Sequence, residues 1–242
     1  MLNPFVMRLR ALTDLDEAEL GAISALLSTE QAFGAEHQLV GEGDRPRKLH
    51  VLIDGWAAHV KWLRNGQRHL PAILLPGDLC DVDGLHLQAY DYGVVTLTPC
   101  RVATMDRDKV QELCTRYPAI ARAFTWLGFV DNSLLGEAAT SVARRSARQR
   151  VAHILCEFMM RLTISGRARA DGYDLPLTQE KLGDALGLTA VHINRTVQAL
   201  RKDGLVQFGS SRVIIPDWTA LVREAGFSTG YLHLEGMAKA AA

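Results

Sequence analysis

The stretch LTQEKLGDALGLTAVHINRTVQALRKDGLV, residues 177–206, has the pattern most specific for one fold. Thr178 is a suitable N-cap for a short helix, which Gly187 would end. Thr189 is a suitable N-cap for a second helix that follows almost at once. The apolar residues of the second helix recur at spacings of four and three: Ile193, Val197 and Leu200. This spacing predicts a helix with a buried inner face and a polar outer face.

Two short helices joined by a turn that contains glycine are typical of a helix-turn-helix. In that motif the first helix supports the second, whose N-terminal side chains enter the major groove of DNA. An ordinary pair of surface helices would show the same spacing. The sequence continues, however, as a two-stranded wing, with strands at residues 205–208 and 212–215 and a turn at residues 209–211. The wing therefore favours DNA binding.

Two side chains of the second helix are suited to reading bases. Arginine can form two hydrogen bonds with guanine and asparagine two with adenine, so we expect Asn194 and Arg195 to read the sequence. The full set of expected DNA contacts comprises residues at the helix starts, on the outer face of the second helix and in the wing: Thr178, Thr189, Ala190, Val191, His192, Asn194, Arg195, Gln198, Arg201, Lys202 and Arg212.

The charge of the chain is zero overall but divides unevenly. Residues 140–215 contain 12 Lys and Arg against 6 Asp and Glu, which leaves 15 basic and 21 acidic residues elsewhere. A basic segment attached to an acidic one is what a DNA-binding domain joined to a separate sensor domain requires, because phosphate neutralisation supplies most non-specific affinity.

With the wing included, residues 177–206 resemble the winged helix-turn-helix of the Crp/Fnr superfamily of bacterial transcription regulators. The chain before them resembles the family's cyclic-nucleotide-binding-type jelly roll. The resemblance implies an α+β fold: an N-terminal antiparallel β jelly roll, a long dimerisation helix and a C-terminal winged helix-turn-helix domain. The implied segments are a sensor domain, a dimerisation helix with hinge, a DNA-binding domain and a C-terminal tail: residues 1–116, 117–142, 143–226 and 227–242.

Short β-type runs separated by turn residues support the jelly roll. Asn65-Gly66 lies between the runs Trp56–Leu63 and Arg68–Leu75, a strong signal for a β-hairpin. Further runs at residues 49–53, 94–98 and 101–106 suit a small antiparallel roll, whose exit segment would end at Tyr117-Pro118.

The cradle for a cyclic nucleotide is missing from this roll. Members of the family that bind one hold the ribose with Gly-Glu and the phosphate with Arg followed by Ser or Thr. This chain has Asp81-Val82 at the first place and Tyr90-Asp91-Tyr92 near the second, and residues 85–93 contain no arginine. Because a carboxylate repels a phosphate, we expect no binding of cyclic AMP and no cofactor.

Other sensors are kept as alternatives: a cyclic nucleotide or another small molecule in the roll, or a haem or redox group. Four histidines of the roll and one cysteine could serve a haem or metal: His50, His59, His69, His86 and Cys80. Dispersed histidines are more often surface or hydrogen-bonded core residues, and a solvated turn explains Asp78, Asp81 and Asp83 better than a cation site does. The first 79 residues contain no cysteine, whereas the family's iron–sulfur members use an N-terminal cysteine group. We therefore expect no metal.

Residues 119–140 predict a long helix with one apolar stripe: Ile120, Phe124, Leu127, Val130, Leu134 and Ala138. Spacing does not distinguish burial in the chain's own domain from pairing with a twin helix. The resemblance implies the second, so we expect a homodimer that reads a palindrome with half-sites about 34 Å apart. It also implies that the regulator acts through RNA polymerase.

The reading positions depart from the family's pattern. They are occupied here by Val191, Asn194 and Arg195, whereas many members have Glu at the first and Ser or Gly at the second. Valine cannot accept a hydrogen bond from cytosine, although it can touch the methyl group of thymine. We expect the operator to differ from the family's usual half-site.

Three other segments have simpler interpretations. Residues 1–30 read as a helical lead-in, with Asp14 or Asp16 as a cap. The arginine-rich segment Ser141–Arg150 reads as a solvated helix face or as a hinge that contacts phosphate. Tyr231–Leu234 would pack on the wing or on a partner chain.

Several classes of protein are excluded by what the sequence lacks. No apolar run approaches the roughly 20 residues that span a bilayer, and the N-terminus lacks a signal-peptide pattern, so a cytoplasmic protein is expected. The motifs GxGxxG, GKS or GKT, HExxH and GxSxG are missing, which gives catalysis no residues to use.

Overall fold

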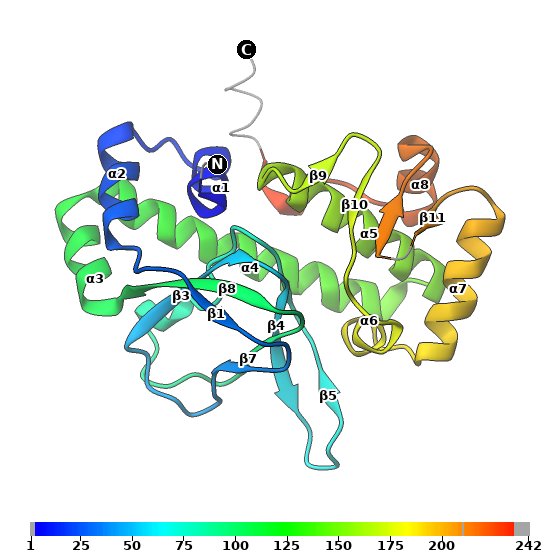
Figure 1. Ribbon diagram of the computed structural model, residues 1–242, viewed down its shortest axis with the longest axis horizontal. Helices are drawn as coiled ribbons and strands as arrows, with labels where there is room; N and C mark the ends of the chain where they lie inside the picture. Colours follow the sequence, from blue (N-terminus) through cyan, green and yellow to red (C-terminus); the bar gives the residue numbers. More distant parts are fainter. Residues whose placement is uncertain (1–2, 210, 235–242) are drawn as a thin grey trace.

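One long helix, α4 (Pro118–Arg144), organises the structure. The computed structural model describes residues 3–209 and 211–234. Helix α4 runs from the N-terminal β roll to the C-terminal helical domain, and both domains pack along it (Figure 1). None of the helices in the described residues is long and apolar enough to cross a membrane.

The N-terminal lead-in is two helices, α1 (Pro4–Leu12) and α2 (Glu17–Leu26). The chain breaks between them because Asp16 caps α2: its carboxylate accepts from the amide of Glu19, and the side chain of Glu19 accepts from the amide of Asp16. This capping box confirms one of the two expected caps. Helix α1 packs on α4 and on the roll.

The β roll is antiparallel throughout, as expected. Its strands are β1 (Gln31–Phe33), β2 (Gln38–Val40), β3 (Lys48–Asp54), β4 (Ala57–Trp62), β5 (Arg68–His69), β6 (Ile73–Leu74), β7 (Gly93–Thr96) and β8 (Cys100–Asp106). They form one sheet in the order β1-β8-β3 and a second in the order β2-β7-β4-β5, with β6 also paired to β4. The hairpin of β4 and β5 projects from the roll (Figure 1).

The exit from the roll contains a helix that the sequence interpretation missed, α3 (Arg107–Arg116). The side chain of Asp106, the last residue of β8, caps it by accepting from the amides of Asp108 and Lys109. Because the cap is also the end of a strand, the helix starts without a separate loop. A short 3-10 helix, η1 (Val82–Leu85), follows the turn at residues 76–79.

The C-terminal domain has the expected winged architecture. Its helices are α5 (Ala147–Ile164), α6 (Gln179–Leu186), α7 (Ala190–Lys202) and α8 (Trp218–Ala225). Its strands are β9 (Ala168–Arg169), β10 (Gly172–Asp174), β11 (Gln207–Phe208) and β12 (Arg212–Ile214), in the order β11-β12-β10-β9. Strands β11 and β12 form the predicted wing; Ser210, assigned to its turn, lies outside the described residues. The α+β fold class is confirmed.

The apolar stripe of α4 faces its own domain, not a free surface. Four of its members are buried with residues of α1 and β3: Ile120, Phe124, Leu127 and Val130. Their expected role as dimer contacts needs surface that their own domain already covers, since each is at most 3% exposed. Leu134 and Ala138 are half-buried. The exposed apolar residues of α4 are Trp126, Phe129, Leu135 and Val142.

The C-terminal segment packs on α4 and α5 and not on the wing. After α8 the chain forms a 3-10 helix, η2 (Gly230–Leu232), against α4. The Tyr231 hydroxyl donates to Glu157 of α5 at 3.0 Å, and His233 Nε2 lies 3.1 Å from the hydroxyl of Ser133 on α4. These contacts place residues 231–234 between the two long helices; residues 235–242 of the expected tail lie outside the description.

Candidate nucleic-acid interface

The helix-turn-helix is built by the local signals that predicted it. Thr178 caps α6 by accepting from the amide of Lys181, and Thr189 caps α7 by accepting from the amide of His192. Gly187 ends α6 in the left-handed conformation at φ 64°. A Cβ atom on Gly183 would lie 2.4 Å from the carbonyl oxygen of Leu188, so only glycine allows this tight turn.

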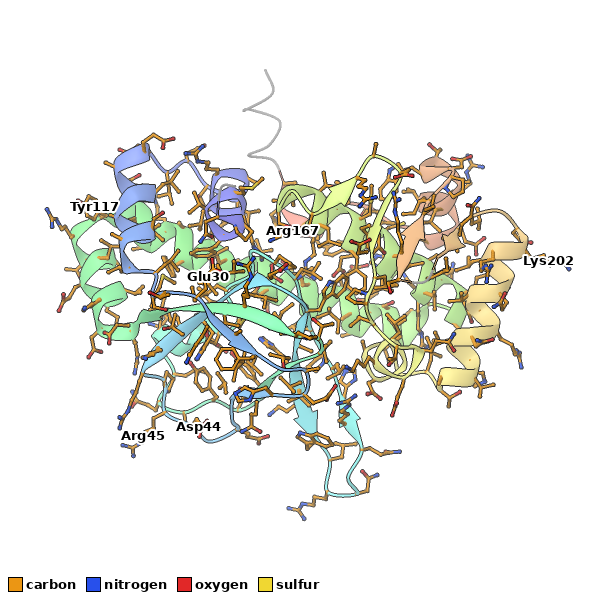
Figure 2. All side chains as sticks on the ribbon, viewed as in Figure 1. Glu30, Asp44, Arg45, Tyr117, Arg167 and Lys202 are labelled. Carbon is orange, nitrogen blue, oxygen red and sulfur yellow. The ribbon has the colours of Figure 1, made fainter. Side chains whose placement is uncertain are left out.

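Helix α7 has one buried and one exposed face. Ile193, Val197 and Leu200 are buried in the core of the domain, as expected. The opposite face carries six of the expected DNA contacts at helical spacing: Val191, Asn194, Arg195, Gln198, Arg201 and Lys202. Val191 is 70% exposed although it is apolar. The spacing brings all six onto one continuous surface, and α7 lies at the outer edge of the molecule, where Figure 2 shows Lys202.

Of the remaining expected contacts, three already use part of their hydrogen-bonding capacity: Thr178, Thr189 and Arg212. The Thr178 and Thr189 hydroxyls act as helix caps, and Ala190 and His192 are exposed in the first turn of α7. Arg212 of β12 forms an ion pair with Asp171 at 2.5 Å. A phosphate contact by Arg212 would therefore share its guanidinium with a carboxylate.

Three arginines of the hinge form intramolecular ion pairs or hydrogen bonds. Arg145 pairs with Glu137 at 2.5 Å, and Arg148 pairs with both Asp203 and Glu224. Arg150 donates to the carbonyl oxygens of three residues: Arg145, Leu186 and Val142. Intramolecular acceptors already engage these three side chains, so a phosphate contact by any of them would share its guanidinium group with such an acceptor. Arg144 is exposed.

At the positions where the family resemblance places the cyclic-nucleotide contacts, the side chains of the roll bond to one another. Asp81 is buried and accepts from the Tyr90 hydroxyl at 2.9 Å and from His50, whose Nδ1 lies 2.7 Å away. The Tyr92 hydroxyl donates to Asp83. Burial and these carboxylates raise the pKa of both tyrosines above the ordinary value, so they remain hydrogen-bond donors.

A cavity of about 420 Å³ remains between the roll and α4. Its wall includes the carboxylates of Asp83, Asp91 and Asp131 and one ammonium group, that of Lys61. The ring of His59 stacks on that of Tyr92 with centroids 4.3 Å apart. This acidic lining opposes an anionic ligand such as a cyclic phosphate.

Three of the histidines considered for a metal or haem contact carboxylate or carbonyl oxygen atoms of the chain: His50, His59 and His69. Among the described residues no group of three or more His, Cys, Asp or Glu side chains is placed to hold a metal ion. His59 and His69 bind the carbonyl oxygens of Cys80 and Asp184. Burial raises the pKa of the Cys80 and Cys156 thiols, which keeps them protonated and unreactive.

The sequence interpretation missed two sets of residues near this interface. Part of the exposed apolar surface of α4 could have been found, because Leu135 and Val142 are seven residues apart and so lie on the same side of the helix. The contacts between α6 and the roll had no local signal, since residues such as Arg68 and Asp184 are 116 positions apart.

A winged helix-turn-helix with an exposed reading face, joined through a long helix to a β roll, defines a two-domain DNA-binding transcription regulator. Comparison with known proteins identifies the family. Residues 149–224 match the model of the Crp-like helix-turn-helix domain, and residues 30–117 match that of the cyclic nucleotide-binding domain. The chain belongs to the Crp/Fnr family, a family of transcription regulators and not of enzymes.

Similar proteins include the transcriptional activator protein FnrL of Cereibacter sphaeroides, which is 26% identical over 87% of this chain and 86% of its own length. The nitrogen fixation regulation protein FixK of Azorhizobium caulinodans is 24% identical over 86% and 84%. Among solved structures, FixK2 from Bradyrhizobium japonicum superimposes with a TM-score of 0.75 and 22% identity over 83% of this chain and 98% of that one. The last comparison supports the fold.

Proposed function

We propose that two copies of this regulator pair through exposed apolar side chains of α4, chiefly Leu135 and Val142, and read a palindromic operator with their two α7 helices. The reading face of α7 carries the proposal, because Asn194 and Arg195 lie on it, exposed, with the chemistry to pair adenine and guanine. Val191 beside them suits a thymine methyl group. The remaining contacts of the set, from Thr178 to Arg212, serve the phosphates.

The proposed pairing residues differ from the stripe members that the chain's own domain buries. Leu135 is 39% exposed and Val142 38%, and the two lie seven residues apart on the same side of α4. A twin helix that covers this face would produce a two-fold dimer with its two reading helices on one side of the duplex. The segments 1–116, 117–142, 143–226 and 227–242 then serve as sensor, dimerisation helix with hinge, DNA-binding domain and tail.

DNA binding in this proposal needs no cyclic AMP. The paired Tyr90 and Asp81, the absence of arginine from residues 85–93 and the acidic cavity lining all oppose a cyclic phosphate. Isothermal titration with cyclic AMP and cyclic GMP tests this, and tight binding of either would favour the alternative of a nucleotide-gated regulator. The absorbance spectrum of the purified protein tests the haem or redox alternative.

The experiment that tests the main proposal is selection of bound duplexes from a random DNA pool. A symmetric reader selects an inverted repeat whose half-sites lie one helical turn, about 34 Å, apart. Selection of a single half-site or of a direct repeat would contradict it. Transcription from the selected operator with purified RNA polymerase tests whether the regulator acts through that enzyme.

A further inference from the structure

Helix α6, the supporting helix of the reading motif, is joined to the β roll by ion pairs. Arg68 of β5 contacts Asp184 of α6 at 2.7 Å and Glu36 of the roll at 3.0 Å. Lys181 of α6 contacts Glu36 at 2.7 Å and also donates to the carbonyl oxygen of Leu97. These four charged residues, Glu36, Arg68, Lys181 and Asp184, form what we term the roll–α6 contact.

Backbone groups strengthen the roll–α6 contact. The amide of Leu70 donates to the carbonyl oxygen of Asp184 at 3.2 Å, and His69 Nδ1 lies 2.8 Å from the same oxygen. The side chains of Arg68, Lys181 and Asp184 are only 15–23% exposed, so solvent screens them less than an ordinary surface pair. Although desolvation opposes it, hydrogen bonds from Lys181 and Arg68 lower the pKa of Glu36.

The contact holds the supporting helix and leaves the reading helix free. Lys181 and Asp184 face the roll, whereas the face of α7 that carries Asn194 and Arg195 is exposed. Helices α6 and α7 pack on each other across a tight turn, so the position of α6 fixes that of α7. The roll in turn packs against α4, the proposed dimer axis.

We propose that Asp184 and Glu36 are positioning residues for DNA recognition: through Arg68 and Lys181 they fix the angle between the reading face of α7 and α4. The inference rests on the proposed function, because the angle matters only where two α7 helices must enter two half-sites at once. A half-site bound by one α7 helix does not depend on it. The contact therefore adds affinity and spacing preference for the palindrome.

Whether neutralising Asp184 or Glu36 weakens or strengthens DNA binding distinguishes a positioning role from simple charge repulsion. Removal of an acidic side chain beside a DNA-binding helix ordinarily strengthens binding, because repulsion of phosphate is lost. Positioning requires the opposite result for the palindrome. Neutral substitutions of Asp184 and Glu36 are thus more informative than substitutions of Lys181 or Arg68, whose loss would weaken DNA binding in either case.

The experiment measures the affinity of the full-length protein for three kinds of duplex by fluorescence anisotropy: the selected palindrome, a single half-site, and palindromes with one or two base pairs inserted at the centre. For Asp184→Asn and for Glu36→Gln we expect about tenfold weaker binding to the palindrome, unchanged or tighter binding to the half-site, and a smaller penalty for the inserted base pairs. Asp184→Glu, which retains the carboxylate, should restore most of the affinity.

A matched control and a second measurement keep the result unambiguous. Glu180 is one turn before Asp184 on α6, is exposed, and forms no ion pair within residues 3–209 and 211–234, so Glu180→Gln should not weaken palindrome binding. Hydrogen exchange at the Leu70 amide reports the contact without DNA and should accelerate in Asp184→Asn but not in Glu180→Gln.

Two different failures can be distinguished. If the wild-type protein binds the half-site as tightly as the palindrome, the proposed symmetric reading fails, and this inference fails with it. If the wild-type protein prefers the palindrome but Asp184→Asn and Glu36→Gln match or exceed its affinity and keep its spacing preference, only the positioning role is overturned.

Discussion

Arg161 of α5 donates a hydrogen bond to Asp78 of the roll at 2.6 Å, although the two residues are 83 positions apart. Both side chains are buried, and the carboxylate of Asp78 also pairs with Arg8 of α1. Arg161 contacts Glu157 at 2.9 Å as well. One carboxylate therefore connects the N-terminal helix, the roll and the first helix of the DNA-binding domain.

We expect Asp78→Ala to lower the free energy of unfolding by about 3 to 5 kcal/mol, because it leaves two buried guanidinium groups without their shared partner. Urea unfolding followed by circular dichroism measures the change. Asp54→Ala is the matched control, since Asp54 pairs with Arg101 and Arg167 but is 45% exposed, and should cost less than about 1 kcal/mol. Equal losses for the two variants would contradict the role of Asp78.

The stability of the protein should fall between pH 7.5 and pH 5 in part through His153. Burial, assisted by the nearby Arg145 guanidinium, lowers the pKa of His153 to about 4. In the unfolded chain His153 takes up a proton near pH 6.5, whereas in the folded chain it does so only near pH 4. The free energy of unfolding therefore decreases as the pH falls through this range. Between the two pH values the loss from this residue is about 2 kcal/mol.

His153→Gln removes that titration, and its stability should depend less on pH by this amount. Urea unfolding at pH 7.5 and pH 5 gives the change in unfolding free energy for each protein. Subtracting the change in the variant from that in the wild type removes the contribution of the other titrating groups. A parallel pH dependence in the two proteins would show that His153 is protonated in the folded state. Glu137, 3.1 Å from His153 Nε2, would then be its partner.

Arg195→Ala should relax specificity at one base pair of the operator at a cost of about 1 to 3 kcal/mol, because a bidentate contact with guanine would be lost. Arg201→Ala, one to two turns further along the same face of α7, should weaken binding to all sequences similarly. Anisotropy titrations on the selected operator and on single-base variants measure both. A uniform loss for Arg195→Ala would contradict its assignment as a base-reading residue.

Leu135→Asp should shift the protein from dimer to monomer and weaken dimerisation by at least about tenfold, because pairing would bury an unpaired carboxylate. Leu63→Asp is the matched control: Leu63 is 56% exposed beside the turn of the β4–β5 hairpin, away from α4. Sedimentation equilibrium measures both variants. Retention of the dimer by Leu135→Asp, or its loss in Leu63→Asp, would place the interface elsewhere.

The helix-turn-helix could be predicted from sequence because its determinants are local. Two threonine caps, one glycine end and one apolar stripe lie within residues 177–206, and each occupies its expected place. The hairpin at Asn65-Gly66 is local in the same sense. Periodicity also located α4 correctly, but it could not say what covers each face, because a core and a twin helix present the same apolar surface to a stripe.

Contacts between distant segments could not be predicted. The pairs formed by Arg68 with Asp184 and by Arg161 with Asp78 join residues 116 and 83 positions apart, and no spacing rule connects them. Helix α3 was not predicted because no turn residues separate it from the strand before it: Asp106 both ends β8 and caps the helix. The packing of Tyr231 on α5 could not be predicted, because its partner, Glu157, lies 74 positions earlier.

The buried stripe of α4 and the exposed apolar residues that follow it impose a strict condition on the length of the helix. Each residue of an α-helix turns the side chains by about 100°, so one inserted residue between Val130 and Leu135 would rotate every later side chain by that angle relative to the roll. Leu135 and Val142 would leave their face, and the hinge at Arg145 would start in another direction. Insertions and deletions in α4 should therefore be tolerated only in steps that restore the helical phase, about seven or eleven residues.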